Sequence, residues 1–322
     1  MHLTAQPNAK RRETLAVVEA LIAISLWGIS FISIKLALAD VSPVTLIVLR
    51  FAMGALIVGA VAWRRGEFAR LAWRDLPALA SVGLIGITLQ QILQVTGQDS
   101  ADASVAAFLA ATAPAFTVAL AAFVLREKPR AWQIAGIALA TAGAITVATN
   151  GDWGALARGN FGAPGNIFVL LSSVVWAVLT IQSKSVVSNR PATFVTAAMF
   201  FFGALFAAPV FIYQQGWREL AASRVSLTGW GAILFTGVVC TAGAYLLNTH
   251  ALKHIPASRV ALIQNLEPLV AVIAAGAILG ESITLAMALG GAAILGGVFL
   301  AERTAPVQAA PEAVQAENAA GD

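Results

Sequence analysis

Glu267 is a carboxylate near the centre of a long apolar stretch, 257–279, and it immediately precedes Pro268. An ionised side chain in the middle of a bilayer costs at least about 2.5 kcal/mol, so it faces water, pairs with a partner or is protonated. We therefore expect Glu267 to bind a substrate amine or to carry a coupled proton. The alternative is a protonated Glu267 that is hydrogen-bonded between helices.

Arg50 is the cation of a second apolar stretch, 44–63. A guanidinium can bind a carboxylate through two parallel hydrogen bonds, so Arg50 is a candidate for a substrate carboxylate. The alternative is that the long side chain extends to the membrane surface, about two helical turns away.

Amide and phenol groups recur at a fixed spacing. Gln91 and Gln94 in the stretch 76–96 match Tyr245 and Asn248, each 154 positions later. Residues three or four apart share a helix face, so each set presents hydrogen-bonding groups on one side. We expect these four residues to line a substrate site; the alternative is hydrogen bonding that only joins neighbouring helices.

Two tryptophans begin matched stripes of residues. Trp27, Phe31 and Lys35 are spaced by four and lie along one helix face, and Trp176 and Lys184 repeat the pattern 149 positions later. Both tryptophans fall near the middle of their apolar stretches, away from the interface where tryptophan is common. They are expected to wall the same site, with lipid or helix packing as the alternative.

Two prolines occupy matched places inside apolar stretches, Pro114 and Pro268, again 154 positions apart. Proline has no N–H, so the carbonyl four residues earlier, on Ala110 and on Gln264, loses its helical partner. These carbonyls become available to a ligand or water, and the prolines are candidate hinges. A kink that only improves packing is the alternative.

These matches belong to an internal duplication. Residues of the stretch 103–143 recur 154 positions later, whereas Phe51 and Gly54 recur after 149 positions as Phe200 and Gly203. Such duplicated membrane units are typical of transporters, in which two halves rock about a shared site.

The composition indicates whether water or lipid surrounds the chain. Apolar residues make up 59% of the chain and charged residues 11%, which predicts an integral membrane protein. A span needs about 20 helical residues, and period-2 alternation is absent, so we expect an all-α fold. The ten expected spans are 16–38, 44–63, 76–96, 103–125, 131–149, 165–187, 192–213, 229–250, 257–279 and 284–301.

The distribution of loop charge predicts the orientation. With the N-terminus inside, the cytoplasmic segments hold thirteen Lys and Arg residues, and the opposite loops hold Arg158, Arg218 and Arg224. Both termini are therefore expected in the cytoplasm, at the inner (plasma) membrane. Because each repeat has five spans, the two repeats are inverted. We divide the chain into an N-terminus (1–15), a first repeat (16–149), a connecting loop (150–164), a second repeat (165–302) and a disordered cytoplasmic tail (303–322).

This topology places charged pairs at both faces. Lys35 and Glu281 fall at the outer face, from different halves, and Lys184 and Glu127 fall at the inner face. We expect them to act as alternating gates, each pair closing one face. The alternative is solvated charges at helix ends, which contribute little.

Other features indicate scaffold. Gly136 and Gly143, with their copies Gly290 and Gly297, are seven apart and predict close helix packing or a dimer surface. His250 and His254 have metal-ligand spacing but lack a Cys or carboxylate companion, so neither a metal nor a cofactor is expected. The basic charge follows from topology and gives no reason to expect a nucleic-acid partner.

The repeated pattern resembles the drug/metabolite transporter superfamily, and in particular its EamA family. The likeness includes Leu26-Trp27-Gly28, Leu49-Arg50-Phe51 and the twice-used Ala-Ser helix start, mid-helix Pro and terminal Glu, over about residues 16–302. This resemblance implies secondary transport of small metabolites, often export of amino acids or drugs, and does not fix the substrate.

We therefore expect a carrier that exports a small amphiphile such as an amino acid. Uptake or facilitated diffusion of another metabolite or drug is the alternative. A membrane-embedded enzyme or scaffold fits less well, because the sequence lacks His-Glu-x-x-His, Gly-x-Ser-x-Gly and phosphate-loop motifs.

Overall fold

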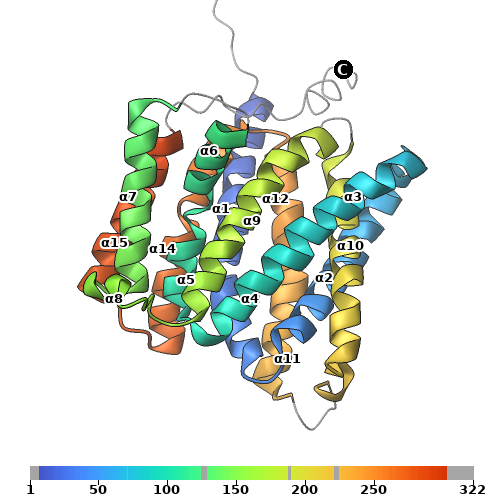
Figure 1. The fold of residues 1–322 in the computed structure, drawn as a ribbon. Coiled ribbons are helices and arrows are strands. Elements are labelled where there is room, and N and C mark those ends of the chain that lie inside the picture. Colours follow the sequence, from blue (N-terminus) through green and yellow to red (C-terminus); the bar gives the residue numbers. More distant parts are fainter. Residues whose placement is uncertain (1–6, 71, 125–128, 188–189, 221–224, 303–322) are drawn as a thin grey trace, which may run out of the picture.

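The computed structural model describes residues 7–70, 72–124, 129–187, 190–220 and 225–302. Within these ranges the chain is helical, without strands, and forms one bundle (Figure 1). The expected tail, 303–322, lies outside the described residues.

Ten helical segments are long and apolar enough to span a membrane, in agreement with the prediction. Six spans are continuous helices. They are α1 (Pro7–Leu38), α2 (Pro43–Arg64), α7 (Ala131–Ala148), α9 (Gly165–Val187), α10 (Ala192–Tyr213) and α15 (Leu285–Glu302).

Two spans contain a π-helical stretch at matched places. The third span consists of α3 (Leu76–Gly83), the π-helical residues Leu84–Leu89 and α4 (Gln90–Ser100). The eighth span consists of α11 (Leu227–Leu234), the π-helical residues Phe235–Gly243 and α12 (Ala244–Ala251). A π-helical turn widens the helix and is frequent at functional sites.

Two further spans are interrupted ahead of the matched prolines. The fourth span breaks between α5 (Ala103–Ala110) and α6 (Ala113–Val124). The ninth span breaks between α13 (Ala257–Gln264) and α14 (Glu267–Ala274), which continues into the π-helical residues Ala275–Leu279. The breaks contain equivalent bonds, from the Thr112 N–H to the Leu109 carbonyl and from the Leu266 N–H to the Ile263 carbonyl. Each proline then sits in the first turn of a new helix, where its missing N–H costs nothing.

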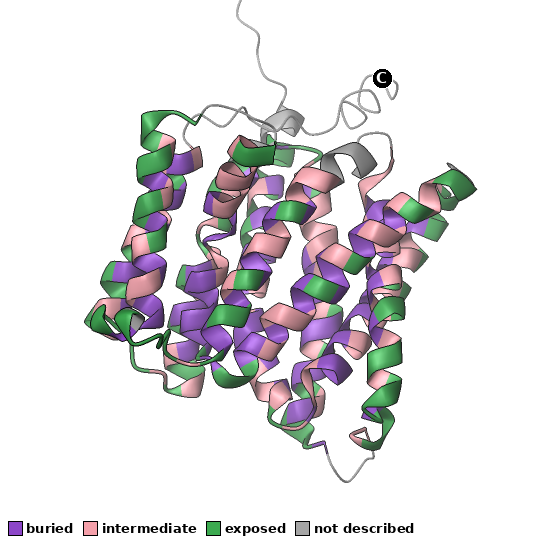
Figure 2. Ribbon diagram, in the orientation of Figure 1, coloured by how far each residue is buried: buried purple, intermediate pink, exposed green. Residues whose placement is uncertain are grey.

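Large apolar side chains cover the outside of the bundle. Figure 2 shows exposed residues along the whole length of the helices and not only at their ends. They include Leu56, Phe123 and Leu285, which are 73%, 85% and 75% exposed. Such a surface is stable only against lipid.

The four matched glycines join α7 to α15. A Cβ on Gly143 would lie 2.5 Å from the Gly290 carbonyl oxygen, and a Cβ on Gly297 would lie 2.4 Å from the Ala140 nitrogen. The two helices lie side by side at one edge of the bundle (Figure 1). The glycine face of α7 therefore packs against the glycine face of α15, as the prediction of close helix packing expects. Neither face is free to form a dimer surface.

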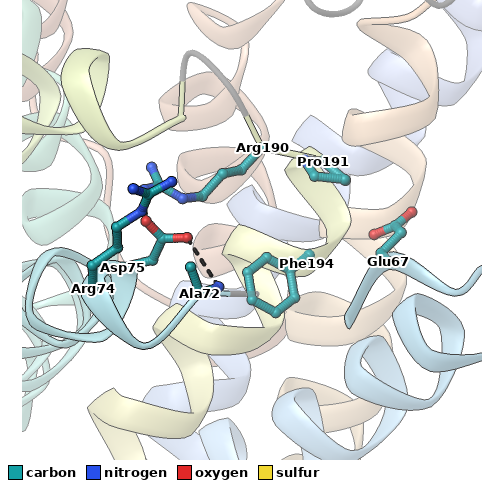
Figure 3. Close-up of a pocket in the computed structure, with 7 residues that line it drawn as sticks. All are labelled: Glu67, Ala72, Arg74, Asp75, Arg190, Pro191 and Phe194. Atoms are coloured by element: carbon teal, nitrogen blue, oxygen red, sulfur yellow. Dashed lines mark hydrogen bonds and ion pairs between the residues drawn. The ribbon is translucent and has the colours of Figure 1, made fainter. Parts of the chain in front are cut away.

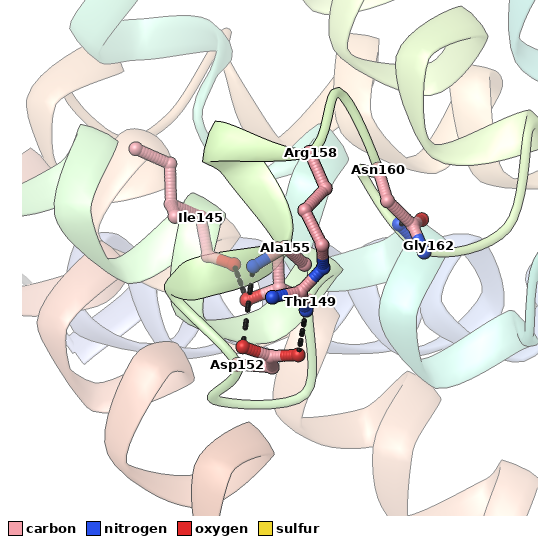
Figure 4. Close-up of polar contacts among 7 residues, drawn as sticks. All are labelled: Ile145, Thr149, Asp152, Ala155, Arg158, Asn160 and Gly162. Atoms are coloured by element: carbon pink, nitrogen blue, oxygen red, sulfur yellow. Dashed lines mark hydrogen bonds and ion pairs between the residues drawn. The ribbon is translucent and has the colours of Figure 1, made fainter.

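The segment between the two repeats carries a short helix, α8 (Gly154–Ala157). Asp152 holds this turn: its carboxylate accepts from the Ala155 N–H at 3.2 Å and from the Arg158 guanidinium at 2.6 Å (Figure 4). Asn150 just before it has φ 49°, a left-handed conformation that asparagine tolerates. The connection is thus a folded turn that leads from α7 to α9.

Candidate functional site

Arg50 is the buried cation at the centre of the bundle. Its side chain is 5% exposed, so it does not extend to the membrane surface. The Nε donates to the Thr241 Oγ1 at 2.7 Å, and one terminal nitrogen donates to the Gln91 Oε1 at 3.3 Å. Among the described residues, no carboxylate pairs with it. Arg50 therefore has a positive charge and further donors that no carboxylate of the described residues neutralises.

A chain of amides continues from Arg50. The Gln91 Nε2 donates to the Gln90 Oε1 at 2.8 Å, and the Gln90 Nε2 donates to the Gln94 Oε1 at 2.7 Å. Gln90 and Gln91 are buried, whereas Gln94 is half-buried. The donors and acceptors therefore form one chain, in which Arg50 donates to Gln91, Gln91 to Gln90, and Gln90 to Gln94.

The π-helical stretch of the eighth span provides the other side of Arg50. Thr241, which accepts from Arg50, donates its own proton to the Thr236 carbonyl at 2.8 Å, and the Thr236 hydroxyl meets the Ser33 hydroxyl at 2.7 Å. Gly237 lets α2 approach, because a Cβ there would lie 2.2 Å from the Met53 Cε. Arg50, on α2, is therefore held by Gln91 of the third span and by Thr241 of the eighth span.

An aromatic row lies beside this polar group. The Tyr245 ring contacts both Trp27 and Phe200 with ring centres 5.0 Å apart, and Phe200 contacts Phe51 at 5.3 Å. Phe51 in turn lies under the Arg50 guanidinium, 4.9 Å from its central carbon. The Trp27 Nε1 donates to the Cys240 carbonyl at 3.1 Å, which fixes the indole against the π-helical stretch. These rings form an apolar wall next to the cation.

Glu267 is the first residue of α14, at the break in the ninth span. The break packs tightly on α1, since a Cβ on Gly28 would lie 2.7 Å from the Glu267 carbonyl oxygen. The side chain is half-buried, and none of the described residues hydrogen-bonds or ion-pairs with it. Gly28 is next to Trp27, whose ring centre lies 5.0 Å from that of Tyr245, so the break is close to these rings. We call Arg50, Gln91, Tyr245, Trp27 and Glu267 the central site.

Four expected site residues lie elsewhere or differ in exposure. Phe31 is 2% exposed and packs into the apolar core with Ala103 and Val272. Trp176 packs against the cluster that includes Leu79. Gln264, at the end of α13, is exposed. Asn248 is half-buried on α12, and its Oδ1 has no hydrogen-bond partner within the described part of the chain.

Lys35 and Glu281 hold the two sides of one turn and do not pair with each other. The Lys35 Nζ donates to the carbonyls of Gln98, Asp99 and Ala101, at 3.0, 3.0 and 2.8 Å. These carbonyls end α4, where a helix attracts a cation. If Lys35 and Glu281 acted as a gate by direct contact, they would form an ion pair. In the structure Lys35 instead binds the carbonyl end of α4.

Glu281 binds the other side of the same turn. Its carboxylate accepts from the backbone N–H groups of Ala103 and Ser104, at 2.8 and 3.0 Å, and from the Ser104 hydroxyl. These groups begin α5, where a helix attracts an anion. We call Lys35 and Glu281 with the turn 100–102 the turn clamp. It joins α1 and the end of the ninth span to the third and fourth spans.

The expected pair at the other face cannot be placed in the same way. Glu127 lies outside the described residues, and the side chain of Lys184 does too, although its backbone belongs to α9.

The histidine pair makes contacts of another kind. The His250 Nδ1 lies 2.6 Å from a Glu19 carboxylate oxygen, and the rings of His250 and His254 are 4.9 Å apart. Partial burial and the nearby charge of His250 lower the pKa of His254. Within the described residues no group of three metal-ligating side chains occurs.

Sequence reasoning missed Thr241, Thr236 and Phe200 as parts of the site. Phe200 carried a usable signal, because it is the repeat copy of Phe51, the residue whose ring it contacts. The threonines carried none, since their role depends on the π-helical turn that aims Thr241 at Arg50.

A ten-span bundle with a polar centre is compatible with a membrane transporter, and the comparisons show this class. The model of the EamA-like transporter family matches residues 14–149 and 163–303, so the chain belongs to that family. A solved crystal structure that is 21% identical shows the same fold, with a TM-score of 0.61 over 89% of this chain and 96% of the other.

Curated relatives are similar over most of their length. An "uncharacterized transporter" of Archaeoglobus fulgidus is 26% identical over 88% of this chain and 96% of its own. A "probable terminal-alkyne amino-acid exporter" of Streptantibioticus cattleyicolor is 26% identical over 89% of this chain and 93% of its own. A "probable amino-acid metabolite efflux pump" of Salmonella typhimurium is 26% identical over 87% and 92%.

Proposed function

We propose that this transporter exports a small zwitterion, an amino acid with an apolar side chain, and that Arg50 binds its carboxylate. The observation that carries the proposal is the buried guanidinium of Arg50, which has no carboxylate partner among the described residues. A buried charge without a counter-ion is costly. A bound carboxylate would supply the missing charge and accept the remaining donors.

The other groups of the central site fit the rest of such a substrate. Glu267 offers a carboxylate for the ammonium group, at the break of the ninth span that packs on α1 beside Trp27. Trp27 and Tyr245, whose half-buried rings pack on each other, offer apolar surface for the side chain. One cation, one anion and an aromatic wall suit a zwitterion better than a phosphorylated or purely cationic substrate.

The proposed direction of transport and the proposed location of the protein rest on the relatives' names and on the distribution of charge. Two relatives carry exporter or efflux names, and the excess of Lys and Arg indicates that the face holding both termini is cytoplasmic. We call this the terminal face, and the plasma membrane is the proposed location. No step of this account requires an enzymatic reaction.

The helices before the two breaks, α5 in the fourth span and α13 in the ninth, occupy matched places in the two repeats. They differ in packing, which supports alternating access. Seven of the eight residues of α5 are buried against neighbouring helices. Among the α13 side chains that the structure describes, Val260 alone is buried, and Leu262 is 57% exposed. The chain is thus proposed to be closed at the face with the turn clamp and open at the terminal face.

Transport then requires the terminal face to close and the face with the turn clamp to open. Release of the turn clamp would free α5, and the breaks ahead of Pro114 and Pro268 are proposed hinges, because each already lacks regular helical bonding. Lys184 and Glu127 remain the proposed counterpart at the terminal face.

Thermal unfolding of the purified protein with a panel of ligands tests the proposal, because a ligand that binds the folded state raises the melting temperature. Leucine or phenylalanine should raise it. The corresponding amine without a carboxylate and the acid without an amine should each do so less. Equal shifts with the amine would contradict the role of Arg50.

A further inference from the structure

Gln98 is a fully buried side chain whose amide makes no hydrogen bond. It lies on α4, two residues before the turn 100–102 of the turn clamp, and it is 0% exposed. Neither its Nε2 nor its Oε1 has a hydrogen-bond partner among the described residues. A buried amide without partners costs free energy, and most buried polar groups in proteins are paired. The fold alone thus gives no reason for an amide at this position, where an apolar side chain would be more stable.

Gln98 continues the line of amides that begins at Arg50. Gln91 and Gln94 precede Gln98 by seven and four residues on the same helix, so the three side chains share one face of α4. The hydrogen-bonded chain from Arg50 ends at the Gln94 Oε1, and Gln98 is the next amide toward the turn clamp. The line therefore leads from the central site to the closed face.

The turn clamp covers the end of this line. The Lys35 Nζ donates to the Gln98 carbonyl at 3.0 Å. Glu281 holds the N–H groups of Ala103 and Ser104 on the other side of the turn. While these bonds persist, Gln98 is closed off from solvent. Release of the clamp, which the proposed transport cycle requires, would give access to Gln98 from that face.

The second repeat has a related group on the way to the terminal face. Gln94 matches Asn248, 154 positions later, on α12, the half of the eighth span that leads to the terminal face (Figure 1). The Asn248 Oδ1 also lacks a hydrogen-bond partner within the described part of the chain. Asn248 is half-buried, whereas Gln98 is fully buried. Each half thus has an unpaired amide group between the central site and one face.

Polar groups in the hollow near the terminal face are arranged differently. This hollow, of about 390 Å³, holds two carboxylates (Figure 3). Asp75 pairs with Arg190 at 2.6 Å, and Glu67 lies 4.0 Å from Arg65. Unlike the amide of Gln98, these carboxylates therefore need no ligand.

We infer that Gln98 is a second binding position for the transported amino acid, occupied after the turn clamp opens; the inference rests on the proposed function. A primary amide has N–H donors and a carbonyl acceptor, so the Nε2 fits the carboxylate and the Oε1 fits the ammonium group of a zwitterion. Both atoms lack a partner in the structure. Because the amide is neutral, its hydrogen bonds are weaker than those of Arg50, and the substrate leaves it more readily.

Gln98→Met tests the inference, because methionine is of similar length and lacks the amide. The melting temperature without ligand should rise, since a buried amide without partners is removed. The further rise caused by leucine should equal that of the wild type, because Arg50 is intact. Exchange of leucine in proteoliposomes should slow about three- to tenfold, as expected for one neutral hydrogen bond. Gln98→Asn, which keeps the amide, should slow exchange less.

Thr88→Val is the matched control in the third span. The Thr88 hydroxyl is buried and donates to the Gly203 carbonyl at 3.0 Å, so valine should lower the melting temperature and leave exchange unchanged. A lower melting temperature of Gln98→Met, or exchange at the wild-type rate, would overturn the assignment of Gln98. A wild-type protein that leucine neither stabilises nor exchanges through would instead contradict the proposed function.

Discussion

The Arg50 Nε donates to the Thr241 Oγ1 at 2.7 Å, between residues that are 191 positions apart in the chain. The bond joins α2 to the π-helical stretch of the eighth span, and both side chains are buried. Thr241 is in turn fixed by its bond to the Thr236 carbonyl. The guanidinium is thereby held in place before any ligand arrives, which lowers the cost of binding a carboxylate.

Arg50→Gln should weaken binding of a zwitterionic substrate about 30- to 150-fold, because a charge-assisted hydrogen bond of about 2 to 3 kcal/mol is lost. Titration calorimetry or a ligand-dependent melting curve measures the change. Arg50→Lys should restore only part of the affinity, since an ammonium group cannot bind a carboxylate in bidentate fashion. Full activity of Arg50→Gln would rule out the assignment.

Glu267→Gln should weaken binding of the amino acid about tenfold, through loss of a charged contact to the ammonium group. Binding of an analogue without the amine should not change. Glu19→Gln is the matched control, because Glu19 contacts His250 and lies outside the central site. An equal loss for the amino acid and the amine-free analogue would show that Glu267 acts through the fold alone.

Glu281→Gln should open the turn clamp, because the two N–H groups that begin α5 donate to different carboxylate oxygens, and the amide replaces one of these oxygens with an NH2 group that only donates. Cys240 is a buried free cysteine, and Cys240→Ala removes its thiol from the labelling experiment. In that background a probe cysteine is placed at Ala106, which is fully buried on α5. Labelling of Ala106→Cys by a membrane-impermeant maleimide should rise severalfold.

The control for the clamp is Glu219→Gln. Glu219 accepts from the Ser42 N–H at 2.8 Å and does not touch the turn 100–102. Its loss should leave labelling at Ala106→Cys near the wild-type rate. Similar labelling in both variants would mean that Glu281 does not keep α5 closed.

Gly297→Ala should destabilise the fold, because the new Cβ would lie 2.4 Å from the Ala140 nitrogen on α7. Overpacking of this kind costs about 1 to 3 kcal/mol. The adjacent Gly296→Ala is the control, since its nearest atom, on Leu139, is 3.9 Å away. Denaturant unfolding in detergent micelles compares the two, and equal stability would contradict the proposed close packing of α7 on α15.

The sequence predicts the ten spans well, because length and hydropathy alone decide whether a helix can cross a bilayer. The duplication also predicts where the fourth and ninth spans are interrupted, since Pro114 and Pro268 each remove a backbone donor. These features depend on local chemistry, which can be read without knowing the neighbouring helices.

The contacts of charged side chains could not be predicted in this way. Lys35 and Glu281 were expected to pair, yet each binds the end of a helix that another part of the chain brings to it. Arg50 bonds Thr241 only because the eighth span is π-helical there. Such geometry follows from tertiary packing, on which residue spacing carries no information.

Counterflow in proteoliposomes tests the central claim most directly. Vesicles that contain the purified protein are preloaded with an unlabelled apolar amino acid, and the uptake of the labelled form is followed. The account predicts rapid exchange, competition by other apolar amino acids, little competition by analogues that lack the carboxylate or the amine, and loss of exchange in Arg50→Gln. Exchange that persists in Arg50→Gln, or competition by the carboxylate-free amine as strong as by the amino acid, would contradict it.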